Sequence, residues 1–135
     1  MLLMILCLAG CQNPFQKQKN EMLEVYSNDE NYITLTGEVV EVYSLEKQSR
    51  IVVKSDDRKD YFPSEDSECE YVIFADDPLE VAVGDVITYT TVKVRFKYSR
   101  DWLPIVELSK DGEILLKSQD GKENFLAWVN QLQYK

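Results

Sequence analysis

The sequence contains no histidine. Histidine is the most frequent general base in enzymes and the most frequent metal ligand in proteins. Without it, the groups that remain to activate a nucleophile are Lys, Asp and Glu. We therefore expect a protein that is not an enzyme, and we predict no catalytic residue, no metal ligand and no cofactor.

Basic residues are also scarce. Fifteen Lys and Arg stand against 24 Asp and Glu, which gives a net charge of −9. A protein that binds nucleic acid needs clustered cations to neutralise phosphates and to release their counterions. The charge balance therefore disfavours nucleic acid as a partner.

Cysteine occurs three times, and two of the three are near the start of the chain, at Cys7 and Cys11. Residues 1–10 are uncharged and apolar, and as a helix they would span about 15 Å. That is half of the roughly 30 Å of bilayer hydrocarbon, so the run has the length of a signal-peptide apolar region. Residues 8–11, Leu-Ala-Gly-Cys, resemble the lipobox of bacterial lipoproteins.

This resemblance implies that residues 1–10 are a lipoprotein signal peptide and that the sulfur of Cys11 carries diacylglycerol after cleavage. Two acyl chains hold a protein on a bilayer permanently. We therefore expect a protein anchored to the cell membrane or cell envelope, on the extracytoplasmic face, with the membrane as one partner. No Lys or Arg precedes the apolar run, which leaves open a start codon upstream of Met1.

Residues 11–31 are expected to join the lipid to the folded domain. Residues 12–20 are polar and contain Pro14 and two lysines, a composition typical of a flexible tether. A short helix is predicted over 21–26, and turn residues follow it. Cys69 is then the single free thiol of the processed chain, and we expect it to be buried.

Residues 32–135 are predicted to form one mainly β domain with a C-terminal helix. Frequent Val, Ile, Thr and aromatic residues favour strands. In the first strand the apolar residues change phase beside Gly37, which indicates a β-bulge. The helix is predicted over 121–133, with Asp120 and Glu123 as a capping box and an apolar stripe on one face, Phe125, Trp128, Val129 and Leu132. The expected strands are 32–44, 50–54, 71–75, 86–98, 102–108 and 114–117. A turn at 76–78 is expected to end the third strand, and an Asp-Gly turn at 111–112 is expected to pair the last strand back as a hairpin.

Two segments, 34–42 (T-L-T-G-E-V-V-E-V) and 83–87 (V-G-D-V-I), resemble OB-fold domains. In that barrel the first strand coils across the sheet, which explains a glycine or bulge at its middle. A lipobox followed by such a domain is similar to the lipoproteins grouped as tRNA-anticodon-domain-like, a family without an assigned activity. The resemblance covers residues 32–108 and implies a small five- to six-stranded OB-like barrel, to which the C-terminal helix is added.

Basic and aromatic residues gather in and after the strand predicted at 86–98. Alternation places Tyr89 on the same face as Lys93 and Arg95. Rings interleaved with cations suit a protein, peptide or glycan, although polar residues also alternate on any exposed strand. We therefore predict a non-catalytic binding module for an envelope protein, peptide or glycan. Its candidate contact residues are Tyr89, Lys93, Arg95, Lys97, Tyr98 and Trp102.

An alternative function rests on the acidic segment 56–70. Ca²⁺ takes six to eight oxygen ligands, so these carboxylates are suitable material for a small calcium-dependent hydrolase. The segment has no glycine and no D-x-D-x-D-G pattern, so a solvated acidic loop is the favoured interpretation and a calcium site stays the alternative. The carboxylates are Asp56, Asp57, Asp60, Glu65, Asp66, Glu68 and Glu70.

Overall fold

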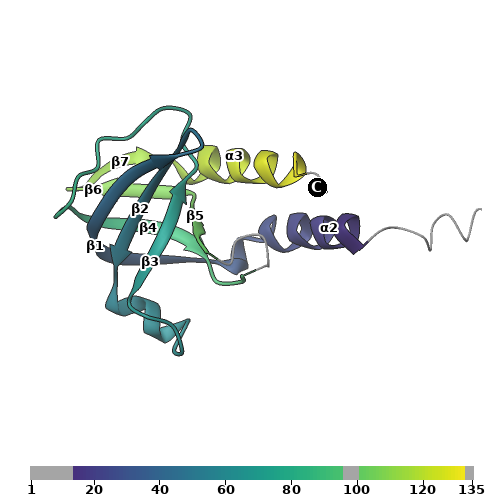
Figure 1. The fold of residues 1–135 in the computed structure, drawn as a ribbon, viewed down its shortest axis with the longest axis horizontal. Helices are drawn as coiled ribbons and strands as arrows, with labels where there is room; N and C mark the ends of the chain where they lie inside the picture. Colours follow the sequence, from purple (N-terminus) through teal and green to yellow (C-terminus); the bar gives the residue numbers. More distant parts are fainter. Residues whose placement is uncertain (1–13, 96–100, 133–135) are drawn as a thin grey trace, which may run out of the picture.

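The computed structural model describes residues 14–95 and 101–132, and within them the fold is mainly β (Figure 1). One mixed seven-stranded sheet curls into a half-barrel, with the strand order β5-β3-β2-β1-β4-β6-β7. The elements are α2 (Pro14–Tyr26), η1 (Asp29–Asn31), β1 (Tyr32–Leu45), β2 (Gln48–Lys54), η2 (Asp56–Asp60), β3 (Glu68–Ile73), β4 (Val86–Val92), β5 (Leu103–Ile105), β6 (Glu107–Lys110), β7 (Glu113–Leu116) and α3 (Ser118–Asn130).

The chain segment 103–110 pairs with two strands that are separated by β2 and β1 in the strand order. β5 pairs in parallel with β3, whereas β6 pairs in antiparallel with β4. Between the two strands, the backbone N–H of Val106 donates to Thr90 O at 3.0 Å. The predicted mainly β fold with a C-terminal helix is confirmed. The predicted number of five to six strands is too low, because the segment predicted as one strand over 102–108 forms two, β5 and β6.

The first strand, β1, is long and irregular at its middle, as predicted. Its first half pairs with β4 and its second half pairs with β2. The register shifts between Val39 and Glu41, so the predicted β-bulge lies just after Gly37. A Cβ on Gly37 would lie 2.6 Å from Val53 Cγ1 and 2.7 Å from Lys54 O. Glycine is therefore needed here for β2 to approach this closely.

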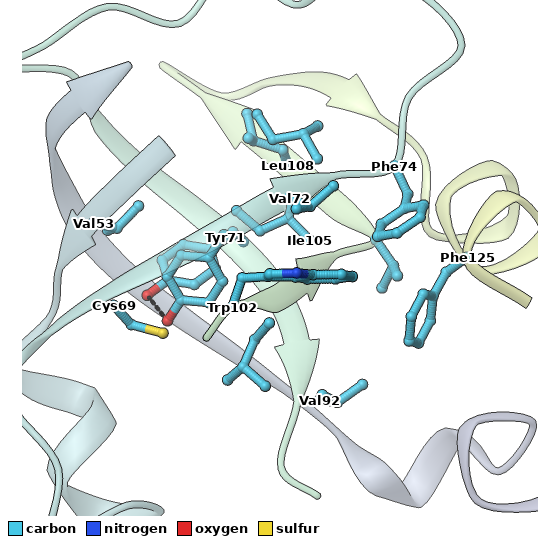
Figure 2. Close-up of a cluster of buried hydrophobic side chains, with 14 of the residues drawn as sticks. Val53, Cys69, Tyr71, Val72, Phe74, Val92, Trp102, Ile105, Leu108 and Phe125 are labelled. Atoms are coloured by element: carbon cyan, nitrogen blue, oxygen red, sulfur yellow. Dashed lines mark hydrogen bonds between the residues drawn. The ribbon is translucent and has the colours of Figure 1, made fainter. Parts of the chain in front are cut away.

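The hydrophobic core fills the inside of the sheet and continues to α3 (Figure 2). The Phe74 ring lies 5.0 Å from Phe125 and 6.1 Å from Trp102, measured between ring centroids. Trp128 completes this aromatic cluster at 5.2 Å from Trp102. Phe125 and Val129 are fully buried, which confirms the apolar stripe predicted for the C-terminal helix.

The helix α3 begins earlier than predicted. It starts at Ser118 and no side chain caps its first turn, so the capping box at Asp120 and Glu123 is wrong. Gly121 allows α3 to approach the backbone at Val106 closely, because a Cβ on this residue would overlap the carbonyl oxygen of Val106. The first turn of α3 therefore packs directly on the backbone between β5 and β6.

The segment expected to be a tether is largely helical. The described part of α2 covers Pro14–Tyr26, so the predicted short helix over 21–26 is the end of a longer one. Met22 and Tyr26 are buried against the domain. α2 lies beside α3, and both helices project from the same side of the half-barrel (Figure 1).

Candidate functional site

The residues predicted to bind a partner are divided between the core and the surface. Tyr89 is fully buried, and its hydroxyl lies 3.1 Å from the hydroxyl of Tyr71, as the dashed line in Figure 2 shows. Trp102 is 8% exposed and packs against Phe74 and Trp128. The expectation that both rings face a partner is therefore corrected, since both side chains belong to the core.

The cations of the predicted contact set have separate surroundings. Lys93 is exposed directly after β4. Arg95 is partly buried, and its Nη2 lies 2.9 Å from Glu65 Oε1. Lys97 and Tyr98 lie outside the described residues. Among the residues that the structure describes, the predicted set is therefore not gathered on one exposed face.

The cause of this difference is the length and phase of β4. The strand ends at Val92, six residues before the end of the predicted strand, so the alternation does not extend to the later cations. At the start of the strand Ile87 and Tyr89 are buried, whereas Val86 is 60% exposed, the reverse of the predicted faces, and from Tyr89 to Val92 both faces are buried. A tyrosine tolerates the core when its hydroxyl has a partner. Burial raises the pKa of Tyr71 and of Tyr89, so both hydroxyls are neutral at physiological pH.

A buried arginine organises the acidic segment 56–70. The Arg58 side chain is 1% exposed, and its Nη2 donates to Glu65 Oε1 at 2.6 Å. Its Nε donates to Asp66 O at 3.2 Å, and its guanidinium lies 4.8 Å from the Phe62 ring centroid. The segment therefore wraps around an internal cation, and Glu65 bonds to this cation and to Arg95.

The carboxylates of this segment are spread out. Asp57 Oδ2 accepts a hydrogen bond from the backbone N–H of Thr36 at 3.2 Å, away from the Arg58 contacts. Across 14–95 and 101–132, no three His, Cys, Asp or Glu side chains are grouped so that they could hold a metal ion. The described structure thus adds no observation in favour of a calcium-dependent hydrolase.

Cys69 lies beside the same arginine and is buried, as expected, at 9% exposure. Burial raises the pKa of its thiol, although the charges of Arg58 and Arg95 act in the opposite direction. A protonated, buried thiol is a poor nucleophile. Cys69 therefore serves packing in this conformation.

An open groove lies where α3 meets the end of β3 and the β1–β2 turn. Its volume is about 390 Å³. Residues 47–49 line it on one side and residues 72–78 on another, and α3 closes the third side. Its charged, amide and aromatic lining residues are Lys47, Gln48, Phe74, Asp76, Asp77, Asn124, Trp128 and Gln131.

The groove combines the rings of Phe74 and Trp128 with amides, two carboxylates and one lysine. Trp128 is half-buried, and its ring is held edge-to-face by Trp102 and Phe74, at centroid distances of 5.2 and 5.9 Å. Asn124 Nδ2 donates to Phe74 O at 3.1 Å, which fixes this amide on the wall. An apolar surface with a few fixed polar groups is typical of small-molecule sites. Amide and carboxylate groups can bond to the hydroxyls of a ligand.

Sequence reasoning missed this groove because its walls come from three distant segments of the chain. The apolar stripe of the C-terminal helix already accounted for Trp128. Residues 76–78 were interpreted as a turn that ends a strand. No local pattern signals that these segments meet.

The chain matches no protein-family model and no curated protein. Neither of the two helices in the described part of the chain is long and apolar enough to cross a membrane. Function must therefore be inferred from the sequence and the geometry of this chain.

Proposed function

We propose that this chain is a lipid-anchored binding module of the cell envelope that holds a glycan in the groove between α3 and the β1–β2 turn. The main support for the proposal is the groove, because its lining combines aromatic rings with amides, carboxylates and one lysine. The lipobox-like residues 8–11 support lipidation of Cys11 and an extracytoplasmic location. The absence of histidine from the whole chain supports a role without catalysis.

The strand pairing supports the finer assignment of an OB-like barrel. β1 pairs with both β2 and β4, and β3 pairs in parallel with β5. OB-fold domains bind oligonucleotides and oligosaccharides on the face of their second and third strands and on adjoining loops. The groove uses residues 47–49 between β1 and β2 and residues 72–73 of β3. The use of these elements supports the groove as the ligand site of an OB-like barrel.

Charge and chemistry favour a glycan among the ligands of such a barrel. Asp76 and Asp77 outnumber Lys47, the one cation among the described residues that line the groove, so the groove would repel phosphates, and so would the net charge of −9. A sugar offers hydroxyls to the amides and carboxylates and an apolar ring face to Trp128. A peptide is the second ligand class, because amides also bond to peptide groups.

Replacing Ala127 with Arg is expected to block the groove. Ala127 is exposed on α3 and lines the groove, so a long side chain there fills it without entering the core. We expect neutral and N-acetylated oligosaccharides to change the tryptophan emission of the wild type saturably. In Ala127→Arg the affinity should fall by at least about tenfold, which is 1.4 kcal/mol.

The matched control is Asn130→Arg, which makes the same charge change on the same helix at an exposed position outside the groove. Its affinity should stay within about twofold of the wild type, as for most surface substitutions. Equal affinity of Ala127→Arg and the wild type would contradict the groove as the site. Saturable binding of short peptides but of no oligosaccharide would contradict the glycan.

Lipidation is tested by replacing Cys11 with Ser. When the full chain is expressed in a bacterium, the wild type should incorporate labelled fatty acid and enter the detergent phase on phase separation. Cys11→Ser should do neither, because a hydroxyl does not replace the thiol as the lipid acceptor. Cys7→Ser is the control, and it should behave like the wild type. A lipid-labelled Cys11→Ser protein would contradict the proposed anchor.

A further inference from the structure

We infer that the lipid on Cys11 holds the α2–α3 end of the domain against the bilayer, so that the domain stands on the membrane in one orientation. The inference rests on the proposed lipidation. Two residues, Gln12 and Asn13, separate Cys11 from Pro14, where the described part of α2 begins. Three steps between neighbouring Cα atoms reach at most about 11 Å. The lipid is therefore close to the start of α2.

The helix α2 is fixed to the domain from its middle to its end. At the end, Tyr26 OH donates to Val94 O at 2.9 Å, and the Tyr26 ring lies 4.9 Å from Phe125. At the middle, Lys19 Nζ donates to Leu132 O at 3.2 Å. Met22, between these contacts, is fully buried. Contacts over two turns prevent α2 from swinging as a flexible tether would.

The same contacts set the direction of the domain relative to the lipid. Tyr26 contacts the middle of α3, whereas Lys19 contacts the residues just beyond its end, so the two helices run antiparallel. Figure 1 shows the start of α2 pointing away from the sheet. A helix of 13 residues is about 20 Å long. The sheet is therefore held at a distance from the bilayer, with the β6–β7 turn on the far side.

The charge distribution favours this orientation on anionic lipid. Residues 12–20 contain Lys17 and Lys19 and no acidic residue, whereas the whole chain has a net charge of −9. Each lysine close to an anionic surface contributes up to about 1 kcal/mol of attraction. The acidic remainder of the domain is repelled when it comes within a Debye length of about 10 Å. Attraction at the start of α2 and repulsion elsewhere both keep the domain upright.

The orientation is measured with fluorescent probes on the lipoprotein itself. Asn20→Cys on α2 and Glu113→Cys on β7 are exposed positions at the two ends of the domain. Each is labelled in a Cys69→Ala background and reconstituted in phosphatidylglycerol–phosphatidylcholine vesicles that contain a nitroxide-headgroup lipid. Because half of α2, about 9 Å, and the sheet lie between the two probes, we expect quenching at Asn20 to be at least about threefold that at Glu113.

A second variant separates a fixed domain from a tethered one. Twelve Gly and Ser residues inserted between Asn13 and Pro14 add a flexible reach of about 20 Å. The insertion should remove most of the difference in quenching between the two probes. Circular dichroism checks that each labelled variant keeps the fold of the wild type.

Vesicle flotation distinguishes failure of the anchor from failure of the orientation. If the protein floats with the vesicles and both probes are quenched equally, the anchor holds and the inferred orientation is wrong. If the insertion variant keeps the full difference in quenching between the two probes, the inference is also overturned. The short connection between Cys11 and α2 would then not be the cause of the orientation. A protein that does not float overturns the lipid anchor and the orientation together.

Discussion

Replacing Gly121 with Ala is expected to destabilise the domain by about 2–3 kcal/mol. A Cβ at this position overlaps the carbonyl oxygen of Val106, which belongs to the backbone between β5 and β6 and cannot rotate away. α3 must therefore shift away from the sheet, which loosens the packing of Phe125 and Val129 in the core. The higher helix propensity of Ala returns about 1 kcal/mol at most, which is included in this figure. The melting temperature should fall by roughly 10 °C.

The control for this substitution is Glu123→Ala, at an exposed position on the next turn of α3. This substitution should change the free energy of unfolding by about 0.5 kcal/mol or less, because an exposed side chain contributes little to stability. Both variants are compared with the wild type by urea unfolding at one temperature. Gly121→Ala with the stability of the wild type would mean that α3 does not rest on the Val106 backbone.

Replacing Arg58 with Met is expected to cost about 2 kcal/mol of unfolding free energy, although Met keeps much of the apolar stem. The substitution removes the bonds to Glu65 Oε1 and to Asp66 O, and it removes the cation from the Phe62 ring. Bonds to charged groups contribute about 1.5–3 kcal/mol each. Part of this loss of stability is offset, because Met also removes the buried Arg58 Nη1, which has no hydrogen-bond partner, and removes the cost of desolvating the charge.

The neighbouring Lys59 provides a matched control. Lys59→Met makes the same change of charge one residue later, on an exposed side chain, and should alter stability by about 0.5 kcal/mol or less. Limited proteolysis adds a local measurement, because Arg58→Met should open the segment 56–68 to cleavage well before the sheet. Equal stability and equal cleavage in both variants would show that the buried arginine does not organise the acidic segment.

The sequence by itself determined the local elements of this protein. The bulge in β1 was predicted from a change of apolar phase beside Gly37, and it lies between Val39 and Glu41. The hairpin of β6 and β7 was predicted from an Asp-Gly turn, and Asp111 and Gly112 have φ values of 54° and 80°. Such features depend on residues that are neighbours along the chain, so a short window contains the required information.

The tertiary structure decided which residues share a surface. In the sequence, Tyr89 and Trp102 have the composition of a binding face, but Tyr71 and Phe74 bury them, and these partners lie in and directly after β3. α2 is polar in sequence and is stabilised by its buried residues and by α3, in agreement with the rule that packing stabilises most helices. The groove needs three segments to meet. Contacts between distant segments leave no periodic pattern in the chain, and they therefore become visible only when the sheet has curled and α3 has packed onto it.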